Sequence, residues 1–134
     1  MRILIDTNIL ISAALFPDGV AAKAYSKAVT YPNKGVICDW SIDELHRVYN
    51  RKFPDRIHSL NQFLAMIVTS IEIIPTPVDK VADEIKIRDI KDRPILRAAQ
   101  FAEVDILLTG DKDFLESGVD KPAIVNPSTF IGKW

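Results

Sequence analysis

Short apolar, β-branched runs alternate along this chain with longer stretches in which apolar residues recur at helical spacing. Runs of three to five residues suit buried strands and are too short for helices. They occupy residues 2–5, 36–38, 71–74, 105–109 and 123–125. Strands that alternate with helices favour parallel pairing, because a helical crossover joins parallel neighbours. The pattern therefore predicts an α/β fold with a largely parallel sheet.

The stretches between these runs predict the helices. Helices are expected at residues 9–16 and 20–29, from Ser41 onward, from Pro54 to Val68, near residues 78–87 and from Pro94 onward. The chain has 134 residues, of which 48% are apolar, and no repeat or linker divides it. That is enough to bury a core without disulfides, so we expect a single domain over residues 1–134.

Composition narrows the class of protein. Seventeen basic and 18 acidic residues give a net charge of -1, which excludes a strongly polycationic nucleic-acid binder but permits local basic patches. The single cysteine, Cys38, lies in an apolar run, so we expect a buried free thiol in a reducing compartment. The opening MRILID lacks the core of a signal peptide, and no run approaches a membrane span. We expect a cytoplasmic protein without a membrane partner.

Acidic residues stand where predicted strands end and helices begin. Asp6 closes the first run, Asp89 and Asp92 precede a predicted helix, and Asp111 and Asp113 follow the fourth run. The carboxyl ends of parallel strands share one edge of a sheet, so these side chains would meet there. Carboxylates packed closely repel one another and usually need a cation. The sequence therefore predicts one metal-binding pocket.

Each acid also has an ordinary structural explanation. Asp6 and Asp111 stand where an N-cap would accept hydrogen bonds from helix amides, and Asp92 could cap the helix that follows. Ser41 and Glu44 match a capping box, in which the glutamate reaches back to the serine amide. Glu44 nevertheless borders the apolar stripe of its helix, where a ligand would lie. Capping and metal binding therefore both stay open for these acids.

Four stretches, taken in order, resemble the PIN-domain nucleases. They are LIDTNILISA at 4–13, ELHRVYNRKF at 44–53, DIKDRPILRAA at 89–99 and LLTGDKDFL at 107–115. The resemblance covers nearly the whole chain and looks closest to the VapC-like toxins of type II toxin-antitoxin pairs. It implies a three-layer α/β/α sandwich around a central, mainly parallel sheet of about five strands.

The resemblance also implies an activity and assigns residues to it. The activity would be divalent-metal-dependent cleavage of RNA, an endoribonuclease reaction that needs Mg²⁺ or Mn²⁺. The residues that match the family's catalytic and metal-binding acids are Asp6, Glu44, Asp92 and Asp111, with Asp113 as an additional metal ligand. The small polar residues that orient the pocket are matched by Thr7, Asn8 and Thr109.

Partners follow from the same resemblance. A VapC-like role implies an RNA substrate and a cognate antitoxin protein. A homodimer is also expected, with the helices at 20–29 or 60–68 as candidate interfaces.

Three arginines are candidates for contact with substrate phosphates. Arg47 and Arg51 belong to a basic stretch around the predicted helix of Glu44 that also holds Lys52 and Arg56, and Arg93 directly follows Asp92. The alternative is a solvated basic face. Arg93 could instead pair with an acid of the pocket and weaken metal binding. A catalytically inactive PIN fold that acts as a binding module therefore stays open.

A second enzyme class also uses an aspartate at the end of a strand. In phosphatases resembling haloacid dehalogenase, a D-x-D pair follows the first strand, and Asp6 would be the nucleophile. The residue two positions later is Asn8 rather than a second acid, so this interpretation is the weaker one.

Overall fold

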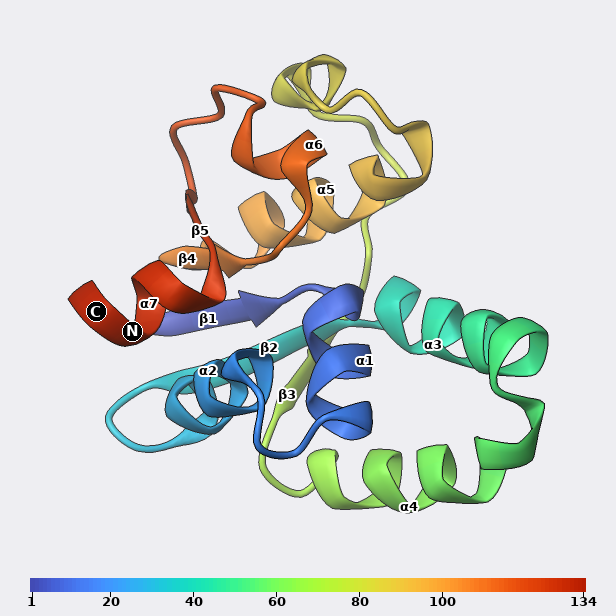
Figure 1. Ribbon diagram of the computed structural model, residues 1–134. Coiled ribbons are helices and arrows are strands. Elements are labelled where there is room, and N and C mark those ends of the chain that lie inside the picture. The colour runs from blue at the N-terminus through green and yellow to red at the C-terminus, as the bar shows by residue number, and fades with distance from the viewer.

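The computed structural model describes all 134 residues and contains one five-stranded sheet. The strands are β1 (Arg2–Ile5), β2 (Lys34–Cys38), β3 (Glu72–Ile74), β4 (Ile106–Leu108) and β5 (Ala123–Val125). They lie in the order β3-β2-β1-β4-β5, and all neighbours are parallel. The predicted parallel sheet is confirmed, and β1, the first strand in sequence, lies at its centre (Figure 1).

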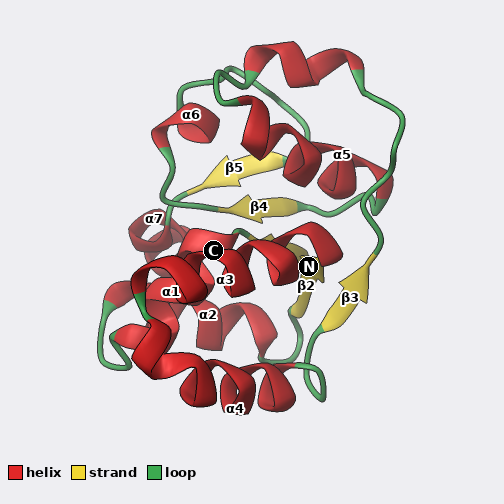
Figure 2. Cartoon of the chain, turned by 90° about the vertical axis from the view of Figure 1, so that its right-hand side faces the viewer, coloured by secondary structure: helices red, strands yellow, loops and turns green.

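Helices cover both faces of the sheet (Figures 1 and 2). One face carries α1 (Thr7–Leu15), α2 (Val20–Val29), α3 (Asp39–Lys52), α4 (Ile57–Ile67) and α7 (Pro127–Lys133). The other face carries α5 (Arg93–Phe101) and α6 (Lys112–Leu115). Short 3-10 helices occur at η1 (Pro54–Arg56), η2 (Ala82–Lys86) and η3 (Ile90–Asp92). The result is the expected three-layer α/β/α sandwich.

The three central strands, β2, β1 and β4, each contribute to two hydrophobic cores, because successive side chains point to opposite faces of a sheet. In β1, Ile3 and Ile5 pack in the core that contains Tyr49 of α3. Leu4 lies between them in sequence and packs in the other core, with Ile95 of α5. Burial on both faces explains why these three strands appear in the sequence as nearly continuous apolar runs.

The carboxyl ends of β1 and β4 lie side by side. Ile5 pairs with Leu108, and the next amide, that of Asp6, donates a hydrogen bond to the Leu108 carbonyl at 3.0 Å. The residue that follows Leu108 is Thr109. The sheet therefore places the segments after both strands next to each other, although more than 100 residues separate them in the chain.

The helix predicted near residues 78–87 is wrong over most of its length. Only η2 is helical there, within an irregular segment that runs from Pro75 to η3. The apolar residues that suggested a helix do not form a buried stripe, since Val78 is 90% exposed and Ile85 is 77% exposed. Glu84 and Ile87 are the buried residues of this stretch.

Helix α7 was not predicted from the sequence, although its start carries a local signal. The side chain of Asn126 accepts a hydrogen bond from the Thr129 amide at 2.8 Å, and Pro127 occupies the first helical turn. An asparagine N-cap followed by proline is a common helix start.

A buried ion pair fastens the irregular segment to α5. The Arg97 Nε atom lies 2.7 Å from Glu84 Oε2, and the Glu84 side chain is only 3% exposed. Arg97 also donates to the Pro77 carbonyl at 3.3 Å. The segment that leads to Asp92 is therefore anchored from both η2 and the preceding loop.

Replacing Arg97 with methionine should destabilise the fold, because it leaves the Glu84 carboxylate buried without its partner. We expect the free energy of unfolding to fall by about 3 kcal/mol, the low end for a buried pair, because Arg97 is 16% exposed. Urea denaturation measures the change. The double variant Arg97→Met with Glu84→Leu should recover part of the loss, since neither charge is then buried. A single variant as stable as the native protein would contradict a structural role for this pair.

Candidate active site

Four carboxylates line a cleft of about 210 Å³ at the carboxyl edge of the sheet. They belong to Asp6, Glu44, Asp92 and Asp111. Asp6 follows β1, Asp111 lies beyond β4, Glu44 projects from α3 and Asp92 ends η3. The structure thus brings together the four acids that the sequence singled out, from four separate segments.

Asp6 is the most deeply buried acid of the cleft, with 4% of its surface exposed. One carboxylate oxygen accepts a hydrogen bond from the Thr7 amide at 2.7 Å, and the other accepts one from the Thr109 hydroxyl at 2.6 Å. Burial raises the pKa of Asp6 to about 7, and the carboxylates of Glu44 and Asp111 add to the effect against the two hydrogen bonds. A bound cation would therefore stabilise the ionised carboxylate of Asp6 near neutral pH.

Asp92 has a similar electrostatic position. Its pKa rises to about 8, first because of burial and then because of the neighbouring carboxyl of Asp111, with further repulsion from Asp6 and Asp89. Two acids of one cleft are thus held well above their usual pKa range. A divalent cation would relieve the repulsion that raises them.

Two polar atoms of the cleft have no hydrogen-bond partner in the protein. They are Thr7 Oγ1 and Asn8 Oδ1, both buried, and both residues line the cleft. Buried polar atoms are normally paired, so two unpaired oxygens at one cleft suggest a ligand or water there. Together with the carboxylates they make an oxygen-rich set of donors. Such a set fits a hard divalent ion such as Mg²⁺ or Mn²⁺.

Thr109 joins two of the acids. Its buried hydroxyl donates to Asp6 and accepts a hydrogen bond from the Asp111 amide at 3.0 Å. A single side chain therefore fixes the carboxylate of one acid and the backbone of the other. Groups that orient ligands in this way commonly tune metal affinity.

Replacing Thr109 with valine should weaken Mn²⁺ binding by about 10- to 100-fold, because the Asp6 carboxylate loses the hydrogen bond that orients it. Isothermal titration calorimetry measures the affinity. Thr109→Ser keeps the hydroxyl and should bind Mn²⁺ like the native protein. Unchanged affinity in the valine variant would show that the hydroxyl does not orient a metal ligand.

Two of the acids both cap a helix and line the cleft. Asp6 is the N-cap of α1, and Asp111 is the N-cap of α6, where it accepts from the Asp113 amide at 2.9 Å. Asp111 uses one oxygen for this bond, and a carboxylate oxygen has two lone pairs. The two explanations that the sequence left open are therefore compatible in these residues.

The capping box predicted for Glu44 is wrong. Helix α3 begins at Asp39 directly after β2, so Ser41 lies inside the helix rather than at its N-cap. The Ser41 hydroxyl lies 3.5 Å from the Cys38 sulfur instead. Cys38 itself is buried, as predicted. Glu44 is free of the capping role and faces the cleft.

Asp113 lies beside the cleft rather than in its lining. Carboxylate oxygens of Asp89, Asp92 and Asp113 lie within 4.8 Å of one another, so Asp92 belongs both to this trio and to the cleft. Asp113 pairs with the Arg88 Nε atom at 2.9 Å, and Asp89 caps η3 by accepting from the Lys91 amide at 3.0 Å. These two acids thus have protein partners of their own.

None of the three predicted arginines lines the cleft. The Arg93 Nε atom donates to the Ile87 carbonyl at 3.0 Å, and the guanidinium forms no ion pair. The idea that Arg93 pairs with an acid of the pocket is therefore wrong. Arg47 lies over the ring of Trp40, 5.1 Å from its centre, and Arg51 is exposed at the end of α3.

Three further residues line the cleft, of which only Lys52 belongs to a stretch that the sequence suggested for phosphate contact. They are Ile11, Val48 and Lys52. Val48 and Lys52 follow Glu44 at intervals of four residues, which places all three on one face of α3. With Glu44 as a candidate ligand, this helical spacing in the sequence predicts that Lys52 lies at the same site.

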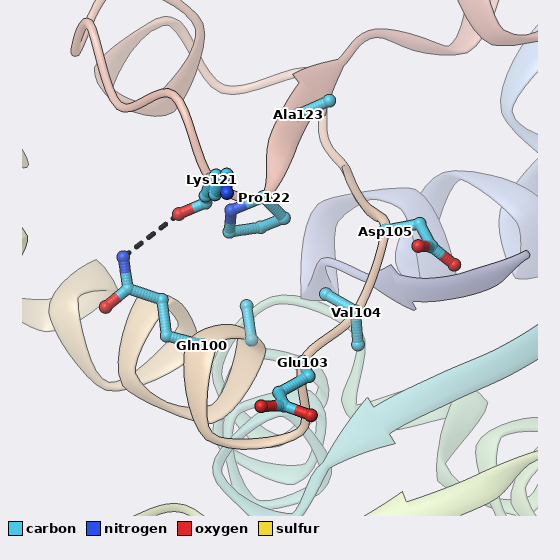
Figure 3. A pocket seen from close by; sticks show the side chains of 8 residues that line it. Gln100, Glu103, Val104, Asp105, Lys121, Pro122 and Ala123 are labelled. Atoms are coloured by element: carbon cyan, nitrogen blue, oxygen red, sulfur yellow. Dashed lines mark hydrogen bonds between the residues drawn. The ribbon is translucent and has the colours of Figure 1, made fainter.

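A larger hollow than this cleft lies elsewhere, at the amino ends of β4 and β5 (Figure 3). It measures about 490 Å³ and is lined by α5 and by the residues that lead into the two strands. Gln100 spans it by donating to the Lys121 carbonyl at 3.0 Å. None of the predicted ligands lies there, so its size does not make it the candidate active site.

Solved structures share this fold. VapBC2 from Rickettsia felis, bound to a DNA fragment from its promoter, matches with a TM-score of 0.71 and 16% identity over 94% of this chain and 98% of that chain. VapC20 from Mycobacterium tuberculosis, a toxin that cleaves the sarcin-ricin loop, matches with a TM-score of 0.63 and 15% identity over 87% of this chain and 95% of that chain. PAE2754 from Pyrobaculum aerophilum matches with a TM-score of 0.62 and 18% identity over 99% of this chain and 88% of that chain. At these identities the likeness shows the fold alone.

The sequence itself identifies the family. No curated protein matches the chain. The family model for the PIN domain, however, matches residues 2–113, a span that contains Asp6, Glu44, Asp92 and Asp111. The phosphatase interpretation of Asp6 finds no support in this match. The chain belongs to the PIN-domain family.

Proposed function

We propose that this protein is a divalent-metal-dependent endoribonuclease that hydrolyses RNA. The observation that carries the proposal is the cleft of four carboxylates, in which burial and mutual repulsion raise the pKa of Asp6 to about 7 and that of Asp92 to about 8. Perturbed acids gathered in a cleft are typical of catalytic and metal sites. Membership of the PIN-domain family supports the same activity.

The residues of the cleft would have separate roles in metal binding and in positioning. Asp6, Asp92 and Asp111 would hold Mg²⁺ or Mn²⁺, and Glu44 would add a carboxylate from α3 that binds an ion or orients a water. When bound, such an ion supplies an activated water and stabilises negative charge on the phosphoryl oxygens. Thr109 would keep Asp6 and Asp111 in place. No side chain need attack the phosphorus, and neither serine nor cysteine lines the cleft.

We further propose that the nuclease is the toxin of a toxin-antitoxin pair. Support comes from the fold shared with VapC20 and with VapBC2. A cognate antitoxin is then the expected partner. A homodimer is the expected assembly, and Val20 on α2 and Met66 on α4 are exposed apolar residues on the two candidate helices. No helix of the chain is both long and apolar enough to cross a membrane.

Incubation of the purified protein, shown to be free of antitoxin, with mixed RNAs tests the activity. We expect cleavage with Mg²⁺ or Mn²⁺ and none in EDTA. An Asp6→Asn preparation purified in parallel controls for contaminating nucleases. Absence of cleavage in both metals would refute the proposal, and equal cleavage by the variant would assign the activity to a contaminant.

A further inference from the structure

Lys52 is the one basic side chain among the residues that line the acidic cleft. It lies at the end of α3, on the face that also carries Glu44 and Val48. Although four carboxylates line the same cleft, no acid lies within 4 Å of the Lys52 ammonium group. Its charge is therefore free for a ligand that enters the cleft.

The position of Lys52 along α3 indicates what it would reach. Eight residues separate it from Glu44, which corresponds to about 12 Å along a helix axis. Val48 lies between them and, with Ile11 of α1, forms an apolar wall. The acids and the ammonium group thus stand at opposite ends of a short apolar stretch. Because successive phosphates of one strand lie closer together than this, the spacing suits an RNA backbone in which one phosphate lies at the acids and another, further along the strand, lies at Lys52.

We propose that Lys52 binds a backbone phosphate of the RNA to one side of the scissile phosphate, while Ile11 and Val48 contact the strand between the two phosphates. The proposal rests on the nuclease function proposed above and adds a substrate-binding residue to it. The arginines that sequence reasoning favoured are less suited, because Arg93 is bound to the Ile87 carbonyl and Arg47 lies on Trp40. Arg51 lies beside Lys52 in sequence but outside the cleft lining.

Two measurements test the assignment. The first is the salt dependence of binding to a fluorescein-labelled single-stranded RNA in Mg²⁺, with Asp6→Asn as the parent so that the RNA stays intact. Removal of one phosphate contact should reduce the slope of log Kd against log salt by about 0.7 for a single strand. The second is steady-state cleavage by otherwise native protein, where Lys52→Ala should raise KM roughly tenfold with little change in kcat.

Two matched variants test whether the changes in slope and KM come from the positive charge of Lys52. Lys52→Arg should restore both the slope and KM, because it restores the charge. Lys121→Ala removes an exposed lysine at the amino end of β5, outside the cleft, and should change neither quantity. A lysine that only complements the dipole of α3 would, when replaced, lower the melting temperature and leave the slope unchanged.

The outcomes separate the two proposals. If the native protein cleaves RNA but Lys52→Ala keeps its slope and KM, the inference about Lys52 is overturned and the nuclease function stands. A loss of slope in Arg51→Ala without one in Lys52→Ala would overturn it equally. If the native protein neither binds nor cleaves RNA, the proposed function fails, and the inference fails with it.

Discussion

Replacing Asp6 with asparagine is expected to abolish RNA cleavage and, at the same time, to stabilise the metal-free protein. The loss of activity should be on the order of a thousandfold, equivalent to ~4 kcal/mol of transition-state stabilisation. The variant keeps the shape of the side chain and removes the negative charge that would hold the ion. Cleavage of a labelled RNA in Mn²⁺ measures this part of the effect.

The gain in stability follows from the burial of Asp6. Its pKa rises from 3.8 to about 7, so ionising it inside the folded protein is costly above neutral pH. A shift of this size corresponds to roughly 4 kcal/mol at pH 8, and asparagine should recover about half of it, since one hydrogen-bond acceptor is lost. Urea denaturation at pH 8 in EDTA measures the change.

An acid outside the cleft provides the control. Asp43 is exposed on α3, next to Glu44 in sequence, and Asp43→Asn should alter neither cleavage nor stability appreciably. If Asp6→Asn is less stable than the native protein in EDTA at pH 8, the carboxylate is not strained by burial. If it cleaves RNA at the native rate, Asp6 does not serve the active site.

The metal-free protein should lose stability as pH rises through the neutral range. Asp6 and Asp92 have folded-state pKa values of about 7 and about 8, above the value near 3.9 expected in the unfolded chain. The unfolded state therefore releases these protons first. Stability is full below about pH 4 and is lost progressively as pH rises through both folded pKa values. Asp6 alone should lose roughly 3 kcal/mol of stability between pH 5 and pH 8, and the half-buried Asp92 should add a further loss that solvent screening reduces.

Thermal unfolding across this pH range in EDTA measures the loss. The double variant Asp6→Asn with Asp92→Asn should give a nearly flat profile, because both raised groups are gone. Mn²⁺ should raise the melting temperature of the native protein most at pH 8 and release protons when it binds near pH 6. Calorimetry in two buffers of different ionisation enthalpy counts those protons. A native protein whose stability in EDTA rises from pH 5 to pH 8 would contradict the cause assigned to both shifts.

Local sequence was sufficient to predict the sheet and the place where the acids gather. The β-branched runs predicted the strands, and the parallel geometry predicted that Asp6 and Asp111 would share an edge. Helix boundaries were harder, because the end of β2 decides where α3 begins. The Ser41 pattern is locally a helix start, yet the chain turns into the helix at Asp39. Tertiary context overrode the local signal.

The contacts of long side chains were not predictable from sequence position. Arg93 stands next to Asp92 in the chain, but its guanidinium turns to the Ile87 carbonyl. Lys52 is eight residues from Glu44 and reaches the same cleft because both lie on one helical face. Periodicity along an element was a better guide to the site than adjacency in sequence.

The central place of β1 has a consequence for how this protein would be made in a cell. Leu4 of β1 pairs with Val36 of β2 on one side and with Leu107 of β4 on the other. The centre of the sheet therefore cannot form until β4 has been translated, about a hundred residues after β1. Asp111, which lies just beyond β4, completes the cleft. A nascent chain on the ribosome therefore has no assembled cleft until translation is nearly finished. The acidic cleft, and any activity that depends on it, can therefore form only when almost the whole chain has been made.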